Sequence, residues 1–176
     1  LGMDEWAPNN SGPWLNHTAE NFTGVNQTWD QGFVDPGPDE RVTSDMMALN
    51  VDEFLVVGTG GYVRHRDANG NWALVNGLVN SQDSHDFQGA WTGAGIMVLA
   101  VTRVQGGGQI THQLWTAPEG TDATNGNSWT VITLESGAYG PDGLYDVWGL
   151  PDGTLRAVGA AKGPGKRLGV VYSRRP

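Results

Sequence analysis

The sequence has 176 residues, only 16% of them charged, and a formal net charge of -9. This acidic balance argues against a nucleic-acid partner, which requires a basic face, and the lack of cysteine excludes disulfides and thiolate metal sites. No apolar run is long enough to span a bilayer, and we expect no signal peptide, because the first residues lack its basic and apolar segments.

Strands, rather than helices, are predicted along the chain. The apolar segments are short, rich in β-branched and aromatic residues, and separated by some of the 27 glycines and by Asn, Asp and Pro. No window shows the 3.6-residue period of an amphipathic helix. The predicted strands are 54–57, 62–65, 72–75, 96–101, 109–115, 129–134, 145–150, 155–158 and 168–173.

A repeating unit organises these strands. A glycine turn, an alternating strand and a histidine recur, and the histidines are 47 or 48 residues apart. A tryptophan then opens the next strand of each unit. Periods of 40 to 50 residues with about four strands each predict propeller blades, which stack on their neighbours to bury their apolar faces. The repeated residues are His17, His65 and His112, followed by Trp29, Trp72 and Trp129.

The predicted fold is therefore all-β, with three to four four-stranded antiparallel blades in an incomplete ring. Residues 1–45 are predicted to form an irregular first partial blade, 46–80 the second blade, 87–137 the third, and 144–176 a fourth, incomplete blade, all within one domain. A β-sandwich or jelly roll built from the same strands is the alternative. An incomplete ring predicts that other copies of the chain, or a second chain, complete the propeller.

Segments 57–72 and 146–159 resemble the blades of bacterial secreted β-propellers. Segments 66–72 and 124–129 are similar to degenerate Asp-box repeats of sialidase- and sortilin-like propellers; Gly70 is displaced by one residue, and Thr124 stands in place of the Asp. The resemblance implies a secreted protein at the cell surface or outside the cell, or in the bacterial periplasm. It also implies a binding or scaffold module whose ligand is a carbohydrate or a protein.

Five residues are predicted to contact a ligand. Trp91 and Trp148 fall at matching places on inner strands, where they would line a channel mouth. Asp83, His85 and Asp86 belong to a polar segment, 81–86, that is predicted to be a loop before an inner strand. The repeated histidines are instead expected to pack and hydrogen-bond between blades, because equivalent points on neighbouring blades are too far apart to share a metal ion.

A calcium site is the one cofactor considered. Asp67, Asn69 and Asn71 offer oxygen ligands, but turn formation explains the same residues. No catalytic residue is predicted, and we expect no enzymatic activity of this chain alone. Two alternatives stay open: part of a propeller-type polysaccharide hydrolase or lyase, for which Asp83, Asp86, Asp142 or Asp146 would supply carboxylates, and a structural subunit of a larger assembly.

Overall fold

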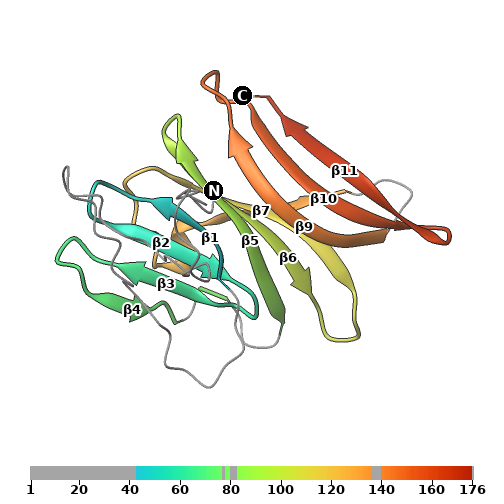
Figure 1. The fold of residues 1–176 in the computed structure, drawn as a ribbon, viewed down its shortest axis with the longest axis horizontal. Coiled ribbons are helices and arrows are strands. Elements are labelled where there is room, and N and C mark those ends of the chain that lie inside the picture. The colour runs from blue at the N-terminus through green and yellow to red at the C-terminus, as the bar shows by residue number, and fades with distance from the viewer. Residues whose placement is uncertain (1–42, 77, 80–82, 136–139, 176) are drawn as a thin grey trace, which may run out of the picture.

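The computed structural model describes residues 43–76, 78–79, 83–135 and 140–175. Across these residues the chain is all-β, with antiparallel strands and a single short 3-10 turn, so the predicted fold class is confirmed at this level. No helix among the described residues is long and apolar enough to cross a membrane. The strands form three separate sheets and, over the described ranges, no closed ring (Figure 1).

Each sheet is made by one continuous stretch of chain, with strands paired in the order of the sequence. The first sheet contains β1 (Thr43–Ala48), β2 (Phe54–Gly58), β3 (Val63–Arg66) and β4 (Trp72–Leu74). The second contains β5 (Ser84–Gly93), β6 (Ile96–Val104), β7 (Ile110–Pro118) and β8 (Thr130–Leu134), with the 3-10 turn η1 (Gly126–Ser128) before β8. The third contains β9 (Gly140–Gly149), β10 (Leu155–Gly163) and β11 (Lys166–Arg174).

At Ser84 and near Trp129 the structure differs from the local structure that the sequence predicts. Segment 81–86 was expected to be a loop, but β5 begins at Ser84, so that His85 and Asp86 lie in a strand. Their polar character is explained by pairing with β6 at its polar end, where His85 is opposite Arg103. Trp129 does not open β8; it caps the preceding 3-10 turn and is buried, with its Nε1 donating to the carbonyl of Ala123 at 3.1 Å.

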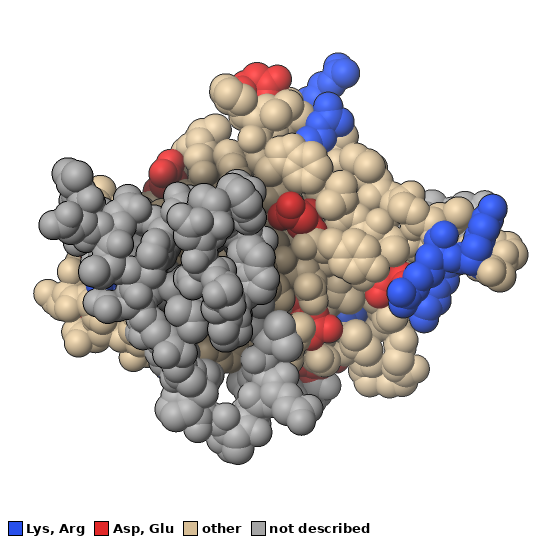
Figure 2. All heavy atoms as spheres, viewed as in Figure 1, with Lys and Arg blue, Asp and Glu red and all other residues tan. Residues whose placement is uncertain are grey.

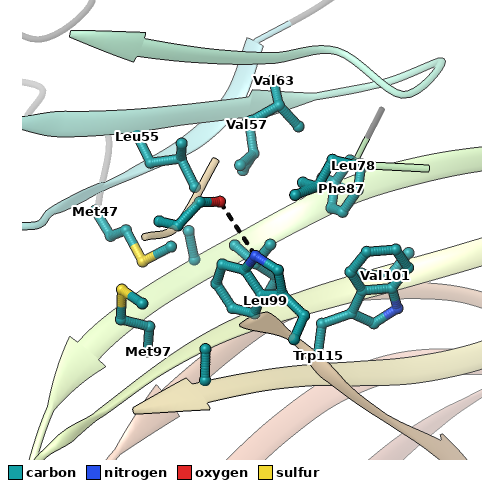
Figure 3. Packing of buried hydrophobic residues seen from close by; sticks show 14 residues of the cluster. Met47, Leu55, Val57, Val63, Leu78, Phe87, Met97, Leu99, Val101 and Trp115 are labelled. Atoms are coloured by element: carbon teal, nitrogen blue, oxygen red, sulfur yellow. Dashed lines mark hydrogen bonds between the residues drawn. The ribbon is translucent and has the colours of Figure 1, made fainter. Parts of the chain in front are cut away.

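The three sheets stack face to face, and β6 is buried on both sides. Met97 and Leu99 point to the core shared with the first sheet, whereas Val98 and Ala100 point to the core shared with the third. Figure 3 shows Met47 of β1 approaching Met97 in the first of these cores. A strand buried on both faces explains why segment 96–101 is apolar without alternation.

Predicted segment 1–45, with His17 and Trp29, lies outside the described residues except for the start of β1. The other predicted segments, 46–80, 87–137 and 144–176, each overlap one sheet. In all three cases the sheet starts earlier than predicted, because β1, β5 and β9 begin at Thr43, Ser84 and Gly140. The polar and glycine-rich beginnings of these three strands contain little of the apolar pattern from which strands were predicted.

Leu99→Ala is expected to lower the free energy of unfolding by about 2–5 kcal/mol, because the side chain is fully buried and its removal leaves a cavity. Urea denaturation followed by tryptophan fluorescence measures the loss. Val131→Ala is the matched control, since Val131 is 47% exposed on β8 and should change stability by less than about 0.5 kcal/mol. Equal losses in the two variants would contradict the stacked core.

Candidate functional site

The outer face of the third sheet is the candidate site, and we call it the open face. Leu155 and Ala157 of β10 point into the core with the second sheet, so Arg156 and Val158 between them point the other way. The strand register places side chains of β9 and β11 beside these two. The open face therefore consists of Asp146, Trp148, Arg156, Val158, Val171 and Ser173. Trp148 remains 37% exposed and Val171 68% exposed.

A bulge marks the same place in the first strand of every sheet. A residue is left without a partner in the register of β1 with β2, of β5 with β6, and of β9 with β10; these residues are Ser44, Gln88 and Tyr145. The pair of β9 with β10 has a second such residue, Asp142. Counting from Ser44, Gln88 and Tyr145 defines two sets of corresponding positions. The residues one position after the bulge are Asp45, Gly89 and Asp146. The residues three positions after the bulge are Met47, Trp91 and Trp148.

Asp45 joins the first sheet to the second. Its Oδ1 accepts the N–H of Met46 at 2.8 Å, and its Oδ2 accepts the N–H of Ala90 in β5 at 2.8 Å. Met47, two residues further on, is buried against the second sheet. A carboxylate that bonds a backbone N–H in the next sheet, followed by an apolar side chain on the same face, thus fixes the contact between β1 and β5.

The second and third sheets meet at the corresponding position, but through different contacts from those between the first and second sheets. A Cβ placed on Gly89 would lie 2.8 Å from Cα of Asp146, so β5 and β9 approach as closely as their backbones allow. Thr102 Oγ1 accepts the N–H of Leu144 at 2.7 Å. The ring of Trp91 lies so close to Gly149 that a side chain there would overlap it. Trp91 is therefore packed between the two sheets.

Within the described residues, Asp146 repeats one of the two hydrogen bonds given above for Asp45. Its Oδ1 accepts the N–H of Val147 at 2.7 Å, as Asp45 does with Met46, but its Oδ2 accepts no hydrogen bond from the described residues. Burial raises the pKa of the Asp146 carboxyl, the bond from Val147 opposes this rise, and the negative charge of Asp45 adds to it. The ionised form of Asp146 is therefore disfavoured, and one of its oxygens has no hydrogen-bond donor among the described residues.

The predicted polar cluster lies elsewhere, beside the contact of the first two sheets. Asp83 accepts two hydrogen bonds from Arg103, at 2.6 and 3.0 Å, and Asp86 accepts the N–H of Gly60 at 2.8 Å. His85 is buried edge-on against Trp115, and burial lowers its pKa. The side chains of this cluster are occupied by contacts that hold strands together.

The two repeated histidines in the described ranges both lie on the third strand of their sheet. His112 is fully buried; its Nδ1 is 2.9 Å from the hydroxyl of Tyr172, which connects the second sheet to the third, and burial lowers its pKa. His65 pairs with Glu53 at 2.7 Å within the first sheet. Trp72 opens β4 and packs on a small separate cluster.

The considered calcium ligands form a tight turn. Asp67 Oδ1 accepts the N–H groups of Asn69 at 2.9 Å and Asn71 at 2.8 Å, and its Oδ2 accepts the Asn71 side-chain amide at 3.0 Å. These hydrogen bonds lower the pKa of Asp67. Nowhere in the described ranges do three or more His, Asp or Glu residues gather as metal ligands.

Sequence reasoning missed the bulges, and with them the correspondence of Asp45, Gly89 and Asp146. The available signal was an Asp two residues before each of Met47 and Trp148. Comparison with known proteins adds no relative, since no family model, no curated protein and no solved structure matches the chain.

Gly89→Ala is expected to separate β5 from β9, because the new methyl group meets backbone atoms that cannot rotate away. Overpacking of this kind costs about 1–3 kcal/mol of the free energy of unfolding. Gly106→Ala is the control, since a Cβ there meets nothing within 4 Å. Chemical denaturation of both variants measures the difference, and an unchanged Gly89→Ala protein would disprove the close approach.

Asp146→Asn is expected to stabilise the isolated chain at neutral pH. The raised pKa means that the native state binds the proton more tightly than the unfolded chain, so stability from this group is present at acid pH and lost as pH rises through the folded pKa. The variant should exceed the wild type in stability at about pH 7 and match it at about pH 3, where both side chains are neutral. Urea unfolding at the two pH values tests this; lower stability at pH 7 would contradict it.

Proposed function

We propose that this chain is an extracellular binding or scaffold module of the β-propeller type, and that its open face takes a further β-sheet from a second copy of the chain. One observation carries the proposal. Asp146 and Trp148 occupy the places that, in the two preceding sheets, face the next sheet of the stack. The ordered series of antiparallel sheets supports the blade interpretation, and the sequence resemblance supports an extracellular setting.

The chemistry of the open face suits a sheet better than a small ligand. Trp148, Val158 and Val171 provide apolar surface spread over all three strands, with no side chain to enclose a small molecule. Full burial of a side chain such as Val171 contributes about 1.5–3 kcal/mol. The unused oxygen of Asp146 can accept one backbone N–H from an incoming strand, as Asp45 accepts that of Ala90.

A protein ligand is therefore favoured over a carbohydrate at this face. Sugar binding commonly uses an aromatic ring that is free on one side. Of the two predicted tryptophans, Trp91 is packed against Gly149, which leaves Trp148 as the one tryptophan of that pair on this face. Asp146 and Arg156 carry opposite charges on the same face. A second copy presenting the same two charges can meet them with opposite signs, as the self-complementary interface of a symmetric dimer requires.

Val171→Glu is expected to weaken self-association, because it places an unpaired charge in the apolar part of the interface. Light scattering coupled to gel filtration should give a discrete oligomer for the wild type. The variant should dissociate with a Kd at least about 10-fold higher, which corresponds to about 1.4 kcal/mol. Trp148→Ala should weaken association in the same direction.

Val131→Glu serves as the matched control, since Val131 is an exposed valine at the outer edge of the second sheet. It should leave the oligomer unchanged. A wild-type chain that stays monomeric at every accessible concentration would refute assembly through a second copy, and equal effects of Val171→Glu and Val131→Glu would refute the open face as the interface.

A further inference from the structure

A groove of about 390 Å³ lies between the ends of the second and third sheets, away from the open face. Figure 1 shows the β5–β6 and β9–β10 turns at this end of the molecule. The floor is apolar and two threonines flank it; its residues include Ile96, Ala117, Leu155, Thr116 and Thr130. Ala94, in the left-handed region at φ +52°, forms part of the wall in the β5–β6 turn.

Two neighbouring arginines, Arg174 and Arg175, complete the groove at the end of β11. Arg174 is opposite Leu155 in the register, so its side chain leaves the sheet on the side that faces the second sheet. No acidic residue lines the groove, and neither arginine forms an ion pair with the rest of the described chain. Figure 2 shows basic side chains near the C-terminal end of β11 and, separately, at the β10–β11 turn.

Two cations without an ion-pair partner among the described residues are notable in a chain whose net charge is -9. The exposed basic group at the β10–β11 turn differs, because Arg167 and Lys162 both contact Asp142, at 2.5 and 3.4 Å. Guanidinium groups bind carboxylates with two parallel hydrogen bonds, which gives both charge and shape selection. The groove is therefore complementary to a ligand that carries a negatively charged group beside an apolar one.

We infer that this groove binds a short acidic peptide segment that also carries an apolar side chain. The apolar side chain lies on the floor beside Ile96 and Leu155, and the carboxylate meets Arg174 and Arg175. Thr116 and Thr130 supply hydroxyl groups that can bond the peptide backbone. An oligosaccharide fits less well, because no aromatic ring lines the groove.

The peptide groove is separate from the open face, since the two lie on opposite sides of the third sheet. Its test therefore uses the Val171→Glu chain as well as the wild type, so that self-association and peptide binding are measured independently. Peptide binding that survives in Val171→Glu supports the groove whether or not the chain assembles with itself.

The probe is a fluorescein-labelled octapeptide of alternating leucine and glutamate, and binding is followed by fluorescence anisotropy. Arg174→Gln combined with Arg175→Gln should raise its Kd at least about 10-fold, and added salt should weaken wild-type binding. Arg167→Gln, which removes a basic side chain outside the groove, should leave the Kd unchanged. Two matched peptides, alternating leucine and lysine or alternating serine and glutamate, should bind at least about 10-fold more weakly.

Three results would overturn the inference. The first is no binding of the leucine–glutamate peptide at about 1 mM, and the second is equal binding of the leucine–lysine peptide. The third is tighter binding of an oligogalacturonate, an acidic sugar without an apolar side chain. A circular dichroism spectrum identical to that of the wild type shows that the double arginine variant is folded, so that a loss of binding reports the groove itself.

Discussion

The burial of one strand, β6, on both of its faces is the constraint on which the rest of the structure depends. Leu99 and Val98 are both fully buried, and they lie on opposite sides of the same sheet. A sheet that is apolar on both faces is stable only between two other layers, since either face exposed to water would cost the burial free energy of its side chains. The first and third sheets are those layers, and their positions follow from this requirement.

The same requirement explains why the contacts between sheets are so specific. Sliding one sheet over another would preserve much apolar burial, but it would break directional contacts. Asp45 bonds the backbone of Ala90, Thr102 bonds that of Leu144, and His112 reaches the Tyr172 hydroxyl. Each of these three contacts can form at only one relative position of the two sheets that it joins. The contacts therefore fix the stacking that apolar burial drives.

The sequence was sufficient to predict most of the strands and the burial of His112, because both depend on local apolar patterns and on turns. It was not sufficient for the candidate site. The correspondence of Asp45 with Asp146 depends on a bulge, which shifts the register by one residue and leaves no mark in composition. Trp91 and Trp148 look alike in sequence, yet one is packed on Gly149 and the other is 37% exposed, because among the described sheets only Trp91 has another sheet in front of it.

Arg174 and Arg175 illustrate a second limit of the sequence. With Lys162, Lys166 and Arg167 they form an ordinary basic C-terminal segment, and nothing in their spacing separates them. The hairpin between β10 and β11 separates them in space, because Lys162 and Arg167 lie at the turn and Arg174 lies at the opposite end of β11. The described lining of the groove at that end includes no acidic residue, so topology, rather than composition, separates these two arginines from the rest of the basic segment.

The proposed interface at the open face would explain why Asp146, a carboxyl whose pKa is raised, lies at this position. Burial and the nearby Asp45 charge disfavour its ionised form, and an uncharged residue would make the isolated sheet more stable. At the corresponding position in the first sheet, both oxygens of Asp45 accept N–H groups, one of them from the next sheet. The second oxygen of Asp146 lacks such a donor among the described residues. An incoming strand that supplied one would remove the penalty on binding, so the same carboxylate that weakens the isolated chain would strengthen the assembly.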